Sequence, residues 1–171
     1  MGLFSSSKRL DSLDDLLLDH LKDLYDAEQR LTKALPKMSA AAHSPALKAA
    51  FDSHLKETEG QLRRLEQAFK ALGRSAQAAT CQAMQGLIAE GDEAVAASGD
   101  PAVKDAALIA AAQRVEHYEM AGYGCARTFA RQLGKTEVAD LLQQTLQEEE
   151  ATDKKLTALA EGSINQQAKK G

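Results

Sequence analysis

The sequence predicts an all-α protein, a bundle of four long helices with one shorter helix between the second and the third. Three observations support this prediction. Apolar residues recur at helical spacing along most of the chain. Alanine and leucine dominate and, with Glu, Lys, Gln and Arg, they are residues that favour helices. Ser-Pro, Gly and Gly-Asp-Pro signals separate the periodic segments, and no segment shows the alternation of a strand.

Length and charge restrict the possible functions. The chain has 171 residues, so we expect one domain over residues 1–171 with short flexible ends at about 1–10 and 162–171. A formal net charge of −4 gives no electrostatic footprint for nucleic acid. No apolar run is long enough to cross a bilayer, and the first ten residues lack the apolar core of an export signal. Two cysteines are too few for a disulfide framework. We therefore expect a cytoplasmic protein with no nucleic-acid or membrane partner.

The first long helix is predicted from Ser12 to Ala42. Ser12 can cap it, because a serine hydroxyl satisfies free amide groups in the first turn. Pro36 falls late in the helix and should kink it. The apolar seam has one gap, which Glu28 fills. The seam residues are Leu17, Leu21, Leu24, Leu31, Leu35 and Met38.

The second long helix is predicted from Ser44 to Leu72, and a shorter one from about Gln77 to Ala97. Ser44 is a suitable cap and Pro45 suits the first turn. Gly73 is a suitable stop. The seam of the second helix comprises Leu47, Phe51, Leu55, Thr58, Leu62, Leu65 and Phe69.

The third long helix is predicted from Pro101 to Leu133, after the stop and cap signals of Gly99 and Asp100. The last should follow Gly134 and reach about Glu161, with a frayed tail beyond. Short connections make sequential helices antiparallel, and the stretch 74–99 is long enough to carry the chain from one end of the bundle to the other. That crossover is the topological mark of ferritin-like bundles.

Carboxylates interrupt the apolar seams of the long helices. Glu116 and Glu119 lie three residues apart on the inward face of the third long helix, and Glu149 and Asp153 fill seam positions in the last. Glu28 fills a seam position in the first long helix. Buried carboxylates are costly unless they are paired or bound to a cation. Converging carboxylates cannot all ionise without one, so the pattern favours a metal with oxygen and imidazole ligands.

The candidate metal ligands of the second long helix are less clear. Glu57 lies at the edge of its seam, while His54 and Gln61 lie closer to the centre. Each position also has an ordinary interpretation: Glu57 as a solvated edge residue, His54 as an interior histidine and Glu28 as the partner of a nearby lysine or arginine. The positions along the helices favour the metal hypothesis. Glu28 and Glu116 each lie on the order of 24 Å from the start of their helix.

The chain resembles the ferritin-like YciE/YciF family of bacterial proteins, and most of the chain from Leu13 to Asn165 takes part in the resemblance. Five stretches in this order carry it: LYDAEQRL (24–31), HLKETEGQLRRLEQAF (54–69), CQAMQGLIAEG (81–91), DAALIAAAQRVEHYEMAGYG (105–124) and EEEATDKKLTALA (148–160). The resemblance implies a ferritin-like bundle with a helical crossover, a homodimer, a dinuclear metal site and a link with stress responses.

The resemblance also shows where this chain departs from better-known ferritin-like proteins. In those proteins each half of the bundle supplies a Glu helix and a Glu-x-x-His helix. Here Gly60 and Thr152 stand where the two histidines would be. Glu116 and Glu119 match the Glu-x-x-Glu of rubrerythrin-like relatives. We therefore expect a site rich in carboxylates and poor in histidine.

The leading hypothesis is a di-iron carboxylate protein that handles oxygen or peroxide, with two manganese ions or a single divalent cation as alternatives. Tyr25 and Tyr123 are candidate donors that orient the carboxylates. The competing hypothesis is a non-enzymatic dimeric stress protein with a structural or vestigial metal site. The candidate ligands are Glu28, Glu57, Glu116, Glu119, Glu149 and Asp153, with His54 as a weaker candidate.

Overall fold

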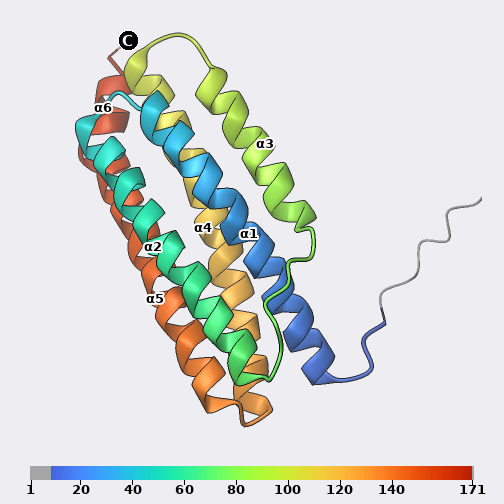
Figure 1. Cartoon of the computed structure of the whole chain (residues 1–171). Helices are drawn as coiled ribbons and strands as arrows, with labels where there is room; N and C mark the ends of the chain where they lie inside the picture. The colour runs from blue at the N-terminus through green and yellow to red at the C-terminus, as the bar shows by residue number, and fades with distance from the viewer. Residues whose placement is uncertain (1–8, 171) are drawn as a thin grey trace, which may run out of the picture.

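The computed structural model describes residues 9–170, and it confirms the all-α bundle (Figure 1). No strand occurs among these residues. Residues 1–8 of the expected flexible N-terminal end, and residue 171, lie outside the described part. Four long helices and a shorter third one form the molecule: α1 (Leu13–Ala41), α2 (Pro45–Ala71), α3 (Gln82–Ala96), α4 (Pro101–Gln132) and α5 (Thr136–Leu159).

Local capping fixes where these helices begin. The Ser12 hydroxyl accepts a hydrogen bond from the Asp15 amide at 3.1 Å. The Asp100 carboxylate accepts hydrogen bonds from two amides in the first turn of α4. At the other ends, Gly73 and Gly134 both have φ of 68°, a left-handed conformation that glycine adopts without strain. The predicted starts of the four long helices and the stops of the first three are therefore confirmed to within about two residues.

The crossover passes along one side of the bundle. Figure 1 shows α1 and α5 running one way and α2 and α4 the other. After α2 the chain returns to the opposite end of the bundle through α3 and then enters α4. The helix α3 packs against α1 and α4. Within the bundle, α1 contacts α2 and α4, while α5 contacts the same two helices from the opposite side. Every long helix therefore has one face directed at a common interior.

The interior is divided into two apolar regions by a polar belt. One region includes Leu31, Phe51 and Leu156, and the other includes Leu24 and Leu65. Between them each long helix places at least one buried polar side chain, at the middle of the bundle. These belt residues are Glu28, His54, Thr58, Gln61, Glu116, Glu119, Thr145, Glu149 and Thr152.

Two predicted boundaries need correction. The last helix does not fray after Glu161: it continues through a π-helical turn (Ala160–Ile164) into α6 (Asn165–Ala168). Ile164 is only 2% exposed, so burial of its side chain holds this turn against the bundle. The shorter helix begins at Gln82 rather than near Gln77, because Cys81 serves as its N-cap.

Candidate metal centre

Four buried side chains converge in the polar belt. His54 comes from α2, Glu116 and Glu119 from α4, and Glu149 from α5. Each offers one ligand atom, and these atoms lie within 4.8 Å of one another. Within residues 9–170 this is the only such group of three or more His, Cys, Asp or Glu residues. A group of this size and chemistry could hold a metal ion.

The His54 ring connects the buried glutamates of this group with the half-exposed Glu57. Its Nε2 atom lies 3.4 Å from Oε1 of Glu116 and 3.9 Å from Oε2 of Glu149. Its Nδ1 atom lies 3.3 Å from Oε2 of Glu57 and 3.4 Å from the Thr152 hydroxyl. Histidines that bind a metal usually donate their other ring N–H to a carboxylate in this way. The structure thus places the weaker sequence candidate at the centre of the group.

Glu28 extends the group from α1. It is completely buried, and the Tyr123 hydroxyl donates a hydrogen bond of 2.5 Å to its Oε1 atom. Desolvation raises the pKa of Glu28 to about 8, with the nearby Glu116 adding to the effect against the hydrogen bond of Tyr123. This contact matches the predicted role of Tyr123 as a donor that orients a carboxylate.

Several polar atoms at the centre make no well-formed hydrogen bond within the protein, and their nearest polar neighbours are one another. Both carboxylate oxygens of Glu119 and of Glu149 are buried without a hydrogen bond, and so are Oε2 of Glu28, Oε2 of Glu116 and Nε2 of His54. Unpaired polar atoms in an interior are costly, each by about 1–3 kcal/mol and more for charged groups. A cluster of so many unpaired polar atoms requires a cation or bound protons.

The electrostatics of the belt point to the same requirement. Burial raises the pKa of Glu119 and of Glu149 well above the usual range, and the neighbouring glutamates raise both further. Burial also raises the pKa of Glu116. Burial opposes the charged form of His54, but Glu116 and Glu57 outweigh it and raise the pKa of the ring. Without a cation, the carboxyls of this belt retain protons to higher pH than exposed carboxyls do.

Two predicted ligands lie at the rim rather than in the group. The Glu57 side chain is 42% exposed and contacts the group through His54. The Asp153 side chain is 20% exposed; its Oδ1 accepts a hydrogen bond from Gln113 and lies 3.3 Å from Nε2 of His117. Each residue lies next to an inward-facing position on its helix and is rotated away from the centre by the helical repeat.

The prediction that Tyr25 orients a site carboxylate is wrong. Its hydroxyl donates to Oε1 of Glu66 at 3.0 Å. Elsewhere in the belt, both carboxylate oxygens of Glu148 accept hydrogen bonds from Arg64, at 2.8 and 2.9 Å. Arg64 also donates to Thr145, so this ion pair closes the belt between α2 and α5.

A second polar network, which the sequence did not indicate, ties the start of α3 to α1. The Cys81 thiol lies 2.9 Å from the Tyr118 hydroxyl, which donates to Asp23. The Cys81 amide donates to Asp26 at 2.8 Å. Cys81 and Cys125 are both free thiols, the first buried and the second exposed. These contacts join segments far apart in sequence, so local patterns do not reveal them.

The fold and the site together define a class: an all-helical bundle whose interior carries a His/Glu cluster able to hold a metal ion. Comparison with known proteins gives the family. The chain belongs to the family described as Domain of unknown function (DUF892), which matches residues 12–169. Within the described residues, no helix is both long and apolar enough to cross a membrane.

Known proteins resemble the chain over almost its whole length. Protein YciF of Escherichia coli (strain K12) is 45% identical over 158 residues, which are 92% of this chain and 95% of YciF. The crystal structure of the E. coli stress protein YciF matches with a TM-score of 0.88 at 44% identity, covering 91% of this chain and 99% of that one.

Two further solved structures are similar. YcfI of Rhodopseudomonas palustris has a TM-score of 0.85 at 44% identity, covering 91% of this chain and 98% of its own. A protein of Xanthomonas campestris has a TM-score of 0.71 at 21% identity, and the match covers 90% of this chain and 94% of that one. The last likeness concerns the fold alone. The resemblance to the YciF family predicted from the five sequence stretches is therefore confirmed.

Proposed function

We propose that the chain is a dinuclear metal protein of the carboxylate type, with iron as the first candidate and manganese as the second, and that it handles oxygen or peroxide under stress. The observation that carries this proposal is the set of unpaired buried atoms on Glu28, His54, Glu116, Glu119 and Glu149. Four carboxylates can neutralise two divalent cations, a stoichiometry that a single structural ion does not need.

The residues present fit such ions. Carboxylates and one imidazole are suitable ligands for iron and manganese. Glu57 holds the outer nitrogen of His54, and Tyr123 holds one oxygen of Glu28, so two of the five ligands are already oriented. When bound, a pair of such ions supplies one-electron redox chemistry toward oxygen or peroxide. The protein's part is to keep the ligands in place and most of the water out.

Metal loading tests this proposal. The purified protein would be loaded with ferrous or manganous ion, and bound metal would be measured after removal of excess. We expect two ions per chain, and a near-ultraviolet band after aerobic iron loading. Glu149→Gln should reduce the stoichiometry, whereas Glu150→Gln, on the exposed side of the same helix, should not. Absence of bound metal in the unaltered protein, or equal stoichiometry in both variants, contradicts the proposal.

A second candidate is the non-enzymatic dimeric stress protein with a structural or vestigial site. Gly60 and Thr152 stand in place of the two histidines, which favours this candidate, and the raised pKa of Glu28 supports bound protons in place of metal. It predicts one bound ion or none and no near-ultraviolet band. We propose a homodimer under either candidate, as the family resemblance implies; light scattering that gives a strict monomer at high concentration contradicts it.

A further inference from the structure

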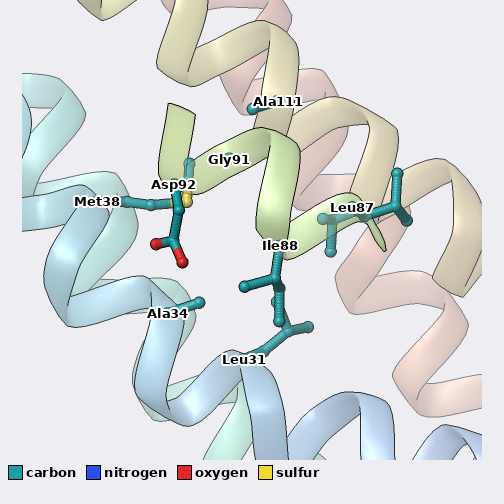
Figure 2. Close-up of a pocket in the computed structure, with 9 residues that line it drawn as sticks. Leu31, Ala34, Met38, Leu87, Ile88, Gly91, Asp92 and Ala111 are labelled. Atoms are coloured by element: carbon teal, nitrogen blue, oxygen red, sulfur yellow. The ribbon is translucent and has the colours of Figure 1, made fainter. Parts of the chain in front are cut away.

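An apolar cavity lies between the crossover helix and the bundle, close to the candidate metal centre. Figure 2 shows residues of α1, α3 and α4 facing a common space. The space allows about 20 Å³ for the centre of a water-sized sphere, above the roughly 10–15 Å³ that one water molecule requires. It is lined by Leu31, Ala34, Met38, Leu87, Ile88, Gly91, Asp92, Ala111 and Val115.

The lining is apolar except at one side. Asp92 is the only polar residue among those that line the cavity. Its carboxylate lies 3.2 Å from Nζ of Lys37, and both side chains are about half exposed. This ion pair joins α3 to α1 and marks the side of the cavity that faces solvent. The inner side offers no hydrogen-bond partner to water or to a polar solute.

Gly91 keeps the space open. It is buried, yet a Cβ atom built on it would meet nothing within 4 Å. Glycine inside a helix costs about 1 kcal/mol relative to alanine, so its presence needs a reason. Close approach of another element is the usual one, and it does not apply here. The effect of this glycine is to leave volume beside Ala34 and Ala111 that a larger side chain would fill.

The inner wall of the cavity lies next to the candidate ligands. Leu31 follows Glu28 by three residues on the inward face of α1, about 4.5 Å along the helix axis. Val115 directly precedes Glu116 on α4, and both are buried. Lining residues of the cavity thus lie within about one helical turn of Glu28 on α1 and of Glu116 on α4.

We propose that this cavity is a binding site for a small apolar gas, dioxygen, through which it reaches the carboxylate centre. An apolar cavity of this size excludes ordered water and accepts small apolar molecules. Hydrogen peroxide would lose its hydrogen bonds to water on entering and regain none from the lining. The use of the gas at the centre rests on the function proposed above, whereas gas binding itself does not.

Xenon tests the binding site directly, because it is apolar and visible in a crystal. Crystals of the full chain under xenon pressure should show a xenon peak among Leu31, Ile88 and Ala111. Gly91→Leu should fill the space and remove the peak. Gly86→Leu is the matched control, because Gly86 lies on the exposed side of the same helix and its Cβ would also meet nothing within 4 Å. No peak in the unaltered protein, or a peak that survives Gly91→Leu, overturns the proposal.

A rate comparison tests the delivery role. In ferrous-loaded protein, Gly91→Leu should slow the oxidation of iron by dioxygen severalfold. The rate of oxidation by hydrogen peroxide and the amount of bound iron should stay unchanged. Gly86→Leu should change none of these three quantities. An unchanged rate with dioxygen overturns delivery. If the loaded protein holds no iron, the proposed function fails while the xenon result still decides the binding site. If Gly91→Leu does not fold, as circular dichroism would show, Gly91→Ala replaces it in both assays.

Discussion

His54 contacts Glu57 through Nδ1 at 3.3 Å and Glu116 through Nε2 at 3.4 Å, so one imidazole connects a half-exposed carboxylate with a buried one. The contact with Glu57 fixes the ring, and fixed rings bind metal better than free ones. Glu57→Gln keeps a hydrogen-bond partner but removes its charge. We expect manganous or ferrous affinity to fall roughly tenfold or more, measured by calorimetric titration. Glu59→Gln, on the exposed side of α2, is the control and should bind as the unaltered protein does.

Glu119 is fully buried and neither of its carboxylate oxygens has a hydrogen-bond partner, so the protein does not compensate its charge. Glu119→Gln removes the charge and nearly keeps the shape. The metal-free variant should therefore melt at the same temperature as the unaltered protein or higher. Metal at one hundred times its dissociation constant should stabilise the unaltered protein by about 2.7 kcal/mol and the variant by much less. Equal metal-induced shifts would show that Glu119 is not a ligand.

The pH dependence of metal-free stability follows from the raised pKa values. Glu28 titrates near pH 8 when folded and near 4.5 when unfolded, so the folded state binds more protons between these values. Stability should therefore fall as pH rises from about 4.5 to 8, by up to about 1.4 kcal/mol per pH unit for each fully shifted group. His54, whose pKa is also raised, acts in the same direction. Denaturant melts at several pH values measure the slope, and Glu28→Gln should reduce it. A metal-free protein whose stability rises across this range contradicts the raised pKa values of the buried carboxyls.

Two glycines in α4 should respond oppositely to alanine. A Cβ on Gly122 would lie 2.9 Å from Cδ2 of Leu24, which is 1% exposed and has little room to move. A Cβ on Gly124 would meet nothing within 4 Å. Gly124→Ala should stabilise the protein by up to about 1 kcal/mol through helix propensity. Gly122→Ala should be less stable than Gly124→Ala by about 1–3 kcal/mol. Urea denaturation of the pair decides; equal stabilities would mean that α1 and α4 adjust freely.

Local features of the fold could be predicted from the sequence because their causes are local. Ser12 and Asp100 cap helices through their own neighbours, and the seam around Glu28 follows from the helical repeat. The buried positions of Glu116, Glu119 and Glu149 followed from the same repeat. The start of α3 was placed too early because cysteine is not a usual cap residue and Cys81 caps it through its thiol.

The sequence alone could not decide which residue of α2, His54 or Glu57, is the better candidate ligand. Helical periodicity placed His54 nearer the seam centre than Glu57, but the ordinary chemistry of carboxylate sites favoured the glutamate as ligand. Only the packing of α2 against α5 decides which of the two faces the interior, because residues three positions apart on a helix point in directions about 60° apart around its axis. The network of Cys81 with Tyr118 and Asp23 was equally hidden, since its three members come from three separate segments.

Among the five main helices of the described residues, the crossover helix α3 has the fewest buried residues. Of its 15 residues only Met84 and Gly91 are buried, whereas 11 of the 32 residues of α4 are. Segments with so few buried contacts unfold locally at a lower free energy than the whole protein, and their amide hydrogens exchange earlier. Transient detachment of α3 would expose the cavity and the wall next to Glu28 and Glu116. For molecules that do not fit the cavity, access to the carboxylate belt would then depend on how frequently one helix lifts away, which is a kinetic property of the fold.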